Sequence, residues 1–210
     1  MKKFERELVR GWIHEPASAS NQGIVLAHGA GSNCESPLLR AVAEAFCAAG
    51  YFALRCDLPF RQQRPHGPPF PALAARDREG LQRAAEAMRE ITGGEVILGG
   101  HSYGGRQASM LLAEHPDGAD MLLLLSYPLH PPRKPEQLRT AHFPSIRTPA
   151  LFVHGARDPF ASFAEMQAAL AAIPARHRLV AIEKAGHELG AAAAPVILEE
   201  TQCFATGSSK

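Results

Sequence analysis

Short apolar runs alternate along the chain with segments whose apolar residues recur every three or four positions. The runs are almost continuously hydrophobic, which is typical of strands buried on both faces of a parallel sheet. Six runs have this character: residues 23–29, 51–57, 95–101, 121–127, 150–155 and 178–183. Residues 4–13 are more polar and alternate, so we expect an exposed antiparallel edge there.

The periodic segments predict helices over residues 36–50, 73–92, 104–115, 161–173 and 189–205. The first has the clearest ends, with Ser36 as cap, Pro37 at the first helical position and Gly50 as terminator. The alternation of strands and helices predicts an α/β fold, with a mostly parallel central sheet flanked by helices on both faces. We expect one domain over residues 1–205 and a flexible tail over 206–210.

Two long proline-rich segments, residues 58–73 and 127–149, fit neither element type, and both follow predicted strands. In open α/β sheets the ligand crevice lies at the carboxyl ends of the strands. Loops longer than about 12–15 residues are uncommon without a function. These segments are therefore expected to line a site, although solvated connections stiffened by proline are the alternative.

Composition narrows the function classes. The 46% hydrophobic and 20% charged residues are typical of a globular protein. Because 22 basic residues balance 21 acidic ones, nothing favours a nucleic-acid or membrane partner. No apolar run approaches the roughly 18–20 residues of a membrane span, and the N-terminal segment lacks the apolar core of a signal peptide. We therefore expect a soluble, cytoplasmic protein, whose oligomeric state the sequence does not reveal.

Four cysteines, Cys34, Cys47, Cys56 and Cys203, lie far apart without a C-x-x-C pair, which predicts reduced thiols instead of disulfides or a zinc site. No set of histidine and acidic residues has metal-ligand spacing such as H-E-x-x-H. Neither a metal nor another cofactor is expected.

The segment Gly100-His101-Ser102-Tyr103-Gly104 has the pattern G-x-S-x-G between a predicted strand and a predicted helix. In that context the pattern marks a tight turn that exposes a nucleophilic serine. A serine hydroxyl needs a base to remove its proton and an acid to orient that base, in the chain order Ser, acid, His. Asp158 follows the next-to-last buried strand and His187 follows the last. We therefore predict that Ser102, Asp158 and His187 form a catalytic triad.

Other residues compete for these roles. His28, His101 and His154 also stand at strand ends, where a hydrogen-bonded structural role is the alternative. Asp57 ends a strand too, but it precedes Ser102 in the chain. Cys34 lies near a glycine-containing loop without a base at a matching position, which disfavours it as a nucleophile.

An oxyanion formed during acyl transfer requires preorganised backbone donors. We predict that the N–H of Tyr103 is one and that the N–H of Ala30, in the loop HGAGSN, is the other. Substrate contacts are assigned to Gly31, Phe60, Arg61 and Tyr127, on loops at the same sheet edge. A small acyl substrate is expected. It is expected to be anionic if the rim cations are more than solvated surface charges: Arg61, Arg64, His66, Arg133, Lys134 and Arg139.

The motifs AHGAG, GGHSYGGRQAS, FVHGARDPF and AGHEL, in that order, resemble the α/β-hydrolase superfamily over essentially the whole chain. The second motif and the segment SYPLHPPRKPEQLRTAHFPSIRTP are similar to a narrower group of dienelactone-hydrolase-like predicted hydrolases, which includes testis-expressed and chromatin-complex proteins. The resemblance implies the superfamily fold, with Ser102 as nucleophile, Asp158 as acid and His187 as base. True dienelactone hydrolases use a cysteine nucleophile, so Ser102 is a departure from them.

Only about twenty residues separate the strands ending near 127 and starting near 150, which leaves no room for a large cap domain. We therefore expect an open site in a serine hydrolase of the carboxylesterase or thioesterase type. It would cleave a small or medium ester or thioester through an acyl-enzyme. The alternative is a non-catalytic scaffold that uses the proline-rich loops to bind a partner, and the intact Ser, Asp and His set argues against it.

Overall fold

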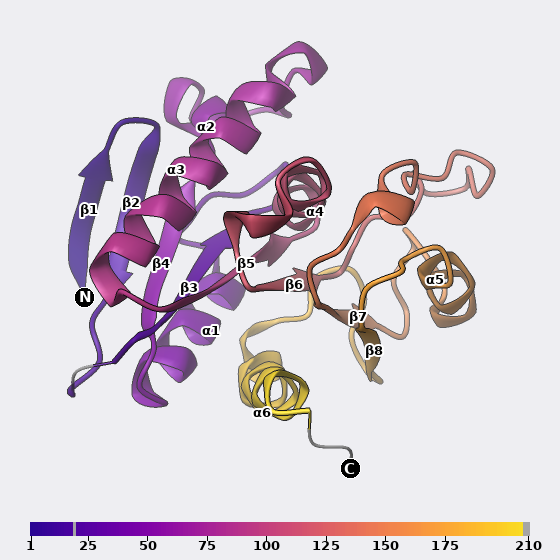
Figure 1. Cartoon of the computed structure of the whole chain (residues 1–210). Coiled ribbons are helices and arrows are strands. Elements are labelled where there is room, and N and C mark those ends of the chain that lie inside the picture. Colours follow the sequence, from indigo (N-terminus) through magenta and orange to yellow (C-terminus); the bar gives the residue numbers. More distant parts are fainter. Residues whose placement is uncertain (19, 208–210) are drawn as a thin grey trace.

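The computed structural model describes residues 1–18 and 20–207. Its centre is an eight-stranded sheet in the order β1-β2-β4-β3-β5-β6-β7-β8 (Figure 1). Strands β3 to β8 run parallel to one another, whereas β2 is antiparallel to both of its neighbours, β1 and β4. The bounds are β1 Lys2–Arg6, β2 Val9–His14, β3 Gln22–Ala27, β4 Phe52–Asp57, β5 Glu95–His101, β6 Met121–Leu125, β7 Ala150–Gly155 and β8 His177–Ile182. All six predicted strands and the antiparallel edge are confirmed. Burial on both faces is wrong for the last of them, because β8 lies at the other edge of the sheet and is half-buried along its length.

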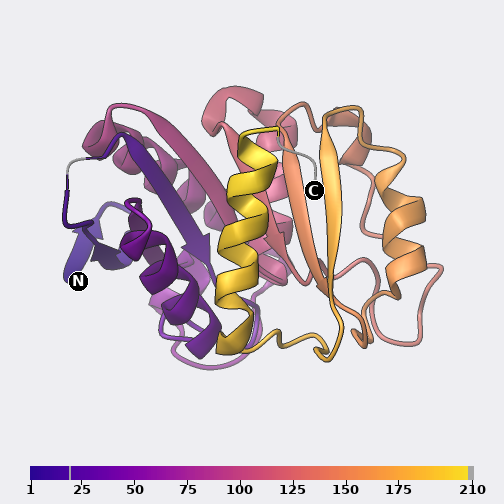
Figure 2. The ribbon, with the colours of Figure 1, turned by 90° about the horizontal axis from the view of Figure 1, so that it is seen from below.

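Helices cover both faces of the sheet, as predicted. Helices α1 and α6 lie together on one face, and α3, α4 and α5 lie on the other (Figure 2). The bounds are α1 Pro37–Ala48, α2 Pro59–Gln63, α3 Ala74–Thr92, α4 Tyr103–Glu114, α5 Phe163–Leu170 and α6 Ala194–Ala205. In α1 the hydroxyl of Ser36 accepts the Leu39 N–H at 3.3 Å, so the predicted cap is present.

The short helix α2 corrects the prediction that residues 58–73 lack regular structure. Pro59 occupies its first turn, and the carboxylate of Asp77 on α3 accepts the Phe60 N–H at 2.9 Å. The group that satisfies the start of α2 thus comes from another helix. Local sequence patterns do not reveal such a contact, because the partner is distant in the chain.

Each central strand is buried on both sides. In β3, Ile24 and Leu26 pack with Phe46 of α1, whereas Val25 packs with Met88 of α3. All five side chains are fully buried. This two-sided burial explains the continuous apolar runs and makes the sheet a rigid platform for the loops at its carboxyl edge.

The connection from β6 to β7 contains only a short 3-10 helix, Phe143–Ser145, so there is no large cap over this edge in the described residues. None of the helices in that part of the chain is long and apolar enough to cross a membrane. Thr206 ends α6, its N–H bonding to Gln202 O at 3.1 Å. Residues 208–210 of the predicted flexible tail lie outside the described residues.

Candidate active site

Ser102 sits at the turn between β5 and α4 with φ 52° and ψ −113°. Positive φ is uncommon for a residue with a side chain, and such strain clusters at functional sites. The backbone N–H of Ser102 donates to Leu125 O at 2.8 Å, which fixes the turn against β6. A Cβ at Gly104 would stand 2.6 Å from His28 O, and one at Gly100 would overlap Ala27 O. The glycines around the serine are therefore required by close backbone approach.

The three predicted triad residues lie in a continuous hydrogen-bonded chain. The Ser102 Oγ lies 2.8 Å from His187 Nε2, and His187 Nδ1 lies 2.9 Å from Asp158 Oδ2. The other carboxylate oxygen of Asp158 accepts the Phe160 N–H at 2.8 Å. The Asp158 side chain is fully buried, whereas the His187 side chain is 17% exposed. This arrangement lets Nδ1–H donate to the carboxylate and leaves Nε2 free to accept the serine proton.

The loops that carry Asp158 and His187 pack directly against each other. The N–H of Arg157 donates to Ala185 O at 2.9 Å. Gly155 makes the close approach possible, because a Cβ there would stand 2.7 Å from the same carbonyl oxygen. These contacts therefore fix the positions of Asp158 and His187 relative to each other.

Two rings flank the imidazole of His187. The Phe160 ring centroid lies 4.1 Å away and the His101 centroid 5.1 Å away. The Nε2–H of His101 donates to the carbonyl oxygen of His187 at 2.9 Å. Burial lowers the pKa of His101, which keeps its ring neutral. The sequence suggested a hydrogen-bonded structural role for His101, and the position of this residue next to Ser102 was a usable signal for its contact with the site.

The predicted oxyanion loop adjoins the serine. A Cβ at Gly29 would stand 3.5 Å from Ser102 Cβ. The carbonyl of Gly29 accepts the Ser32 N–H at 3.1 Å and the His28 Nδ1–H at 2.8 Å. Because C=O and N–H point in opposite directions across a trans peptide, these bonds turn the Ala30 N–H the other way. Among the residues described, neither that N–H nor the Tyr103 N–H is paired with a protein acceptor.

His28 is the anchor of this loop. Its ring is fully buried and its Nε2 accepts the Leu58 N–H at 3.1 Å. Burial lowers the pKa of His28, so the neutral ring donates from Nδ1 and accepts at Nε2. The histidine at this strand end is thus hydrogen-bonded within the fold, which was the alternative considered from the sequence.

Arg61 is placed differently from the predicted substrate contact. The residue is only 6% exposed, and its guanidinium donates to Ala30 O at 2.8 Å, Ser32 O at 2.8 Å and Gly67 O at 3.0 Å. A buried guanidinium requires acceptors for its donors, and here backbone carbonyls supply them. Arg61 therefore clamps the oxyanion loop instead of facing a substrate.

Tyr127 also differs from its predicted role. It is 1% exposed, its ring packs against Phe143 and Phe152, and its hydroxyl donates to Arg139 O at 2.6 Å. The strand-end position suggested a loop residue, but the side chain points into the core. This buried position leaves no surface for a substrate.

The other two predicted substrate contacts differ from each other. Phe60 is 3% exposed and packs edge-on against Tyr103, with centroids 5.7 Å apart. Gly31 is exposed and has open space where a Cβ would stand. Of the four, Gly31 alone borders open space, and Phe60 supports the ring of Tyr103, the residue after Ser102.

Asp77 was missed by the sequence analysis. Its side chain is buried, Oδ1 accepts the Phe60 N–H, and Oδ2 accepts the Tyr103 hydroxyl at 2.8 Å. Burial raises the pKa of this carboxyl. Asp77 thereby links α2, α3 and the start of α4. No sequence signal marks it, because it lies within a helix and not at a strand end.

The competing candidates have other partners. Asp57 Oδ1 accepts the Cys34 N–H at 2.7 Å, and burial raises the pKa of the Cys34 thiol to about 12. A thiol with that pKa is a poor nucleophile at neutral pH. Within residues 1–18 and 20–207, no three His, Cys, Asp or Glu side chains form a group that could hold a metal ion.

A family model described as an alpha/beta hydrolase domain matches residues 20–200. The chain belongs to the alpha/beta hydrolase family. Its fold is shared by solved structures of low sequence identity. Crystal structures of TT1662 from Thermus thermophilus and of a dienelactone hydrolase from Anabaena variabilis give TM-scores of 0.77 and 0.72, at 21% and 24% identity. The first match covers 97% of both chains, and the second covers 94% of this chain and 91% of that one.

A third similar structure is Est1E from Butyrivibrio proteoclasticus with bound ferulic acid. It has a TM-score of 0.76 at 15% identity, and the match covers 98% of this chain and all (100%) of that one. These identities support a common fold and no more. Family membership supports hydrolase activity for this alpha/beta hydrolase, and the resemblance noted from the motifs is confirmed.

Proposed function

We propose that this alpha/beta hydrolase is a serine esterase or thioesterase that acts on a small or medium acyl group. The observation that carries the proposal is the hydrogen-bonded chain from Ser102 through His187 to Asp158. The solved neighbours include a dienelactone hydrolase and an Est1E complex with ferulic acid, which favours carboxylic esters as substrates.

In the proposed reaction the Ser102 Oγ attacks the acyl carbon while His187 Nε2 accepts the hydroxyl proton. Asp158 stabilises the imidazolium through Nδ1–H. The carbonyl oxygen becomes an oxyanion that accepts the N–H groups of Ala30 and Tyr103. The imidazolium then protonates the leaving alcohol or thiol as the acyl–oxygen or acyl–sulfur bond breaks.

Deacylation repeats these steps with water as the nucleophile. His187 removes a proton from water, hydroxide adds to the acyl carbon, and the proton returns to Ser102 Oγ as the acid is released. The positive φ of Ser102 supports this role because it presents the hydroxyl above the turn.

A fluorophosphonate probe tests the proposal. The folded wild-type protein should be labelled at Ser102 and should hydrolyse members of a panel of p-nitrophenyl esters and acyl thioesters. Ser102→Ala should remove both signals, whereas Ser145→Ala, at an exposed serine far along the chain, should retain them. A folded wild-type protein that is neither labelled nor active on any ester would contradict catalysis and favour the scaffold alternative.

A further inference from the structure

A groove of about 430 Å³ lies between the first turns of α3 and α4, beside the predicted site. One wall is the proline- and alanine-rich segment 69–75, and the two helices supply the rest: Arg78, Tyr103, Arg106, Gln107 and the apolar Met110. Tyr103 directly follows the predicted nucleophile, so this α3–α4 groove begins where the reaction would occur. Its polar lining carries two guanidinium groups.

Arg106 is close to the nucleophile and lacks a full set of partners. The backbone N–H of Arg106 donates to Ser102 O at 2.9 Å, so Arg106 lies one helical turn after Ser102. In the part of the chain that is described, its Nε is buried without a hydrogen-bond acceptor, and no carboxylate forms an ion pair with it. Leaving a buried donor without an acceptor is unfavourable, and more so when the donor belongs to a charged group. The Tyr127 hydroxyl is a neutral hydrogen-bond partner of this side chain, so it leaves the charge of Arg106 uncompensated, and an anion in the groove would offset that charge.

Arg78 faces the same groove and is only partly neutralised. Its Nη1 donates to Gln107 Oε1 at 3.2 Å, and its Nε lies 3.6 Å from a carboxylate oxygen of the half-exposed Glu114. The neighbouring carboxylate of Asp77 is already bonded to the Phe60 N–H and the Tyr103 hydroxyl. The groove therefore keeps positive charge on both of its helical walls.

Among the groups around Arg106, Arg139 increases this excess, and the neutral Tyr127 and His142 do not offset it. Arg139, the phenol of Tyr127 and the ring of His142 lie within its electrostatic reach. His142 donates from Nε2 to Ser109 Oγ at 2.8 Å. Burial, followed by the charges of Arg106 and Arg78, lowers the pKa of His142 to about 4. No neighbouring carboxylate offsets Arg106 or Arg139 by an ion pair within the described residues.

We propose that the α3–α4 groove binds a carboxylate or phosphate group of the substrate, with Arg106 and Arg78 as its ligands. The inference rests on the proposed function, because it names the substrate class of that site. Four residues of helix rise about 6 Å, so the anionic group would lie a few bonds from the scissile carbonyl. The expected substrates are half-esters of dicarboxylic acids and esters or thioesters whose leaving group carries a phosphate.

The proposed anion site is thus the α3–α4 groove, and not the rim residues that were considered from the sequence. Arg64, His66, Arg133 and Lys134 are exposed on their loops, where water screens their charges. Arg61 is engaged by backbone carbonyls. The groove arginines are more enclosed, and a charge-assisted bond is stronger in such a setting.

Matched esters test the proposal. The wild-type protein should prefer mono-p-nitrophenyl glutarate to neutral p-nitrophenyl butyrate in kcat/KM. Arg106→Gln should lower kcat/KM for the anionic ester about 10- to 100-fold, as expected for one charge-assisted bond, and should lower it much less for the neutral ester, which lacks the anion. Arg106→Lys should recover part of the preference. Arg76→Gln, at an exposed position of α3 outside the groove, should leave both rates unchanged.

Direct binding separates this proposal from the proposed function and distinguishes the two anions. Inorganic phosphate and succinate, tested separately, should raise the Tm of the wild-type protein and of Arg76→Gln, but not that of Arg106→Gln. If no ester is cleaved and these shifts still appear, the anion subsite stands while the hydrolase proposal fails. If esters are cleaved, equal losses on both esters and absent Tm shifts would overturn the subsite.

Two further variants keep the test decisive. Arg78→Gln replaces Arg106→Gln if the latter does not fold, and it should reduce the same preference to a smaller extent because Glu114 already neutralises part of its charge. Glu114→Gln should strengthen anion binding severalfold. Weaker anion binding by Glu114→Gln would contradict the proposed role of Arg78.

Discussion

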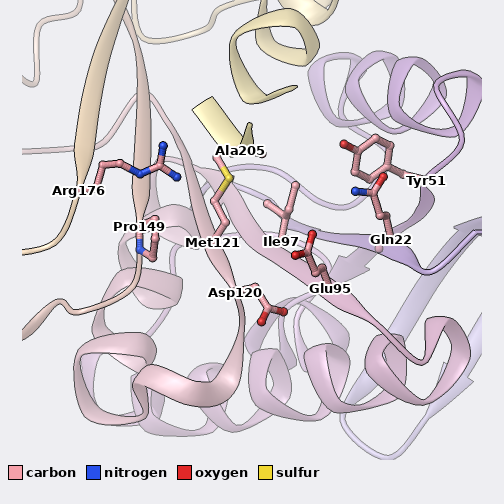
Figure 3. A pocket seen from close by; sticks show the side chains of 10 residues that line it. Gln22, Tyr51, Glu95, Ile97, Asp120, Met121, Pro149, Arg176 and Ala205 are labelled. Carbon is pink, nitrogen blue, oxygen red and sulfur yellow. The ribbon is translucent and has the colours of Figure 1, made fainter. Parts of the chain in front are cut away.

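The two edges of the central sheet both carry charged side chains, but they use them differently. At the amino edge a cavity of about 230 Å³ is lined by Tyr51, Glu95, Asp120 and Arg176 among others. Figure 3 shows Arg176 and Tyr51 on opposite sides of this cavity. Asp120 accepts the Val96 N–H at 2.8 Å, and Arg176 donates to Phe204 O at 2.6 Å. These charged groups are bonded to neighbouring elements of the fold.

At the carboxyl edge several polar groups lack partners inside the described chain or are held under strain. Ser102 has a positive φ, the N–H of Ala30 is turned away from its neighbours, and Arg106 Nε is buried without an acceptor. The difference shows that the presence of a cavity with charged walls does not identify a site. Polar groups that lack a partner within the protein, and are therefore free to bind a ligand, identify a site better than charged cavity walls do.

Matched Asp→Asn substitutions give the sharpest contrast between the edges. Asp158→Asn should lower kcat on a p-nitrophenyl ester by about 10⁴-fold, because the amide no longer holds the imidazole in the productive tautomer. Asp120→Asn should leave kcat unchanged and lower the free energy of unfolding by at most about 1 kcal/mol, because the amide oxygen can still accept the Val96 N–H and the lost charge faces the half-exposed Arg89. Steady-state kinetics and urea unfolding measure the two quantities. Comparable kcat losses in both variants would break the distinction.

A matched pair of arginines tests whether the oxyanion loop needs its clamp. Arg61→Gln should reduce kcat about 10- to 100-fold, because the carbonyls of Ala30 and Ser32 lose their donors and the loop can move. Arg176→Gln, which loses a carbonyl contact at the amino edge, should reduce Tm without changing kcat. Unchanged kcat in folded Arg61→Gln would show that other contacts suffice to hold the loop.

The smallest expected effect is on acid stability. The pKa of His142 is about 4 in the folded protein and 6.5 for the ordinary side chain of an unfolded chain. Between pH 4 and pH 6.5, the unfolded chain therefore binds a proton that the folded chain does not. Stability is therefore full above pH 6.5 and falls as the pH decreases toward 4. His142→Gln should flatten this part of a curve of unfolding free energy against pH. His177→Gln, at the amino edge, provides the reference, and an equal slope in wild type and His142→Gln would refute the assignment.

The positions of Ser102, Asp158 and His187 could be predicted because each follows a strand that is recognisable from its apolar run. The direction in which a loop side chain points could not be predicted in this way. Arg61 and Tyr127 also follow strands, yet one turns toward backbone carbonyls and the other packs into the core. These outcomes depend on acceptors contributed by distant segments.

The residues that support the site were harder to find for the same reason. Asp77, within α3, accepts hydrogen bonds from Tyr103 and Phe60. The environment of Arg106 is formed by Tyr127 and His142, which are distant in the sequence. Helical periodicity assigns such residues to a face but does not reveal their partners. The anion groove thus became visible only when α3 and α4 were placed side by side.

The contact between His101 and the backbone of His187 has a mechanical consequence. His101 and Ser102 are consecutive residues, so the turn that presents the hydroxyl also holds the peptide of the base. Thermal motion that displaces this turn displaces the imidazole with it. This shared anchoring would hold the distance between Ser102 Oγ and His187 Nε2 steadier than two separate anchors would.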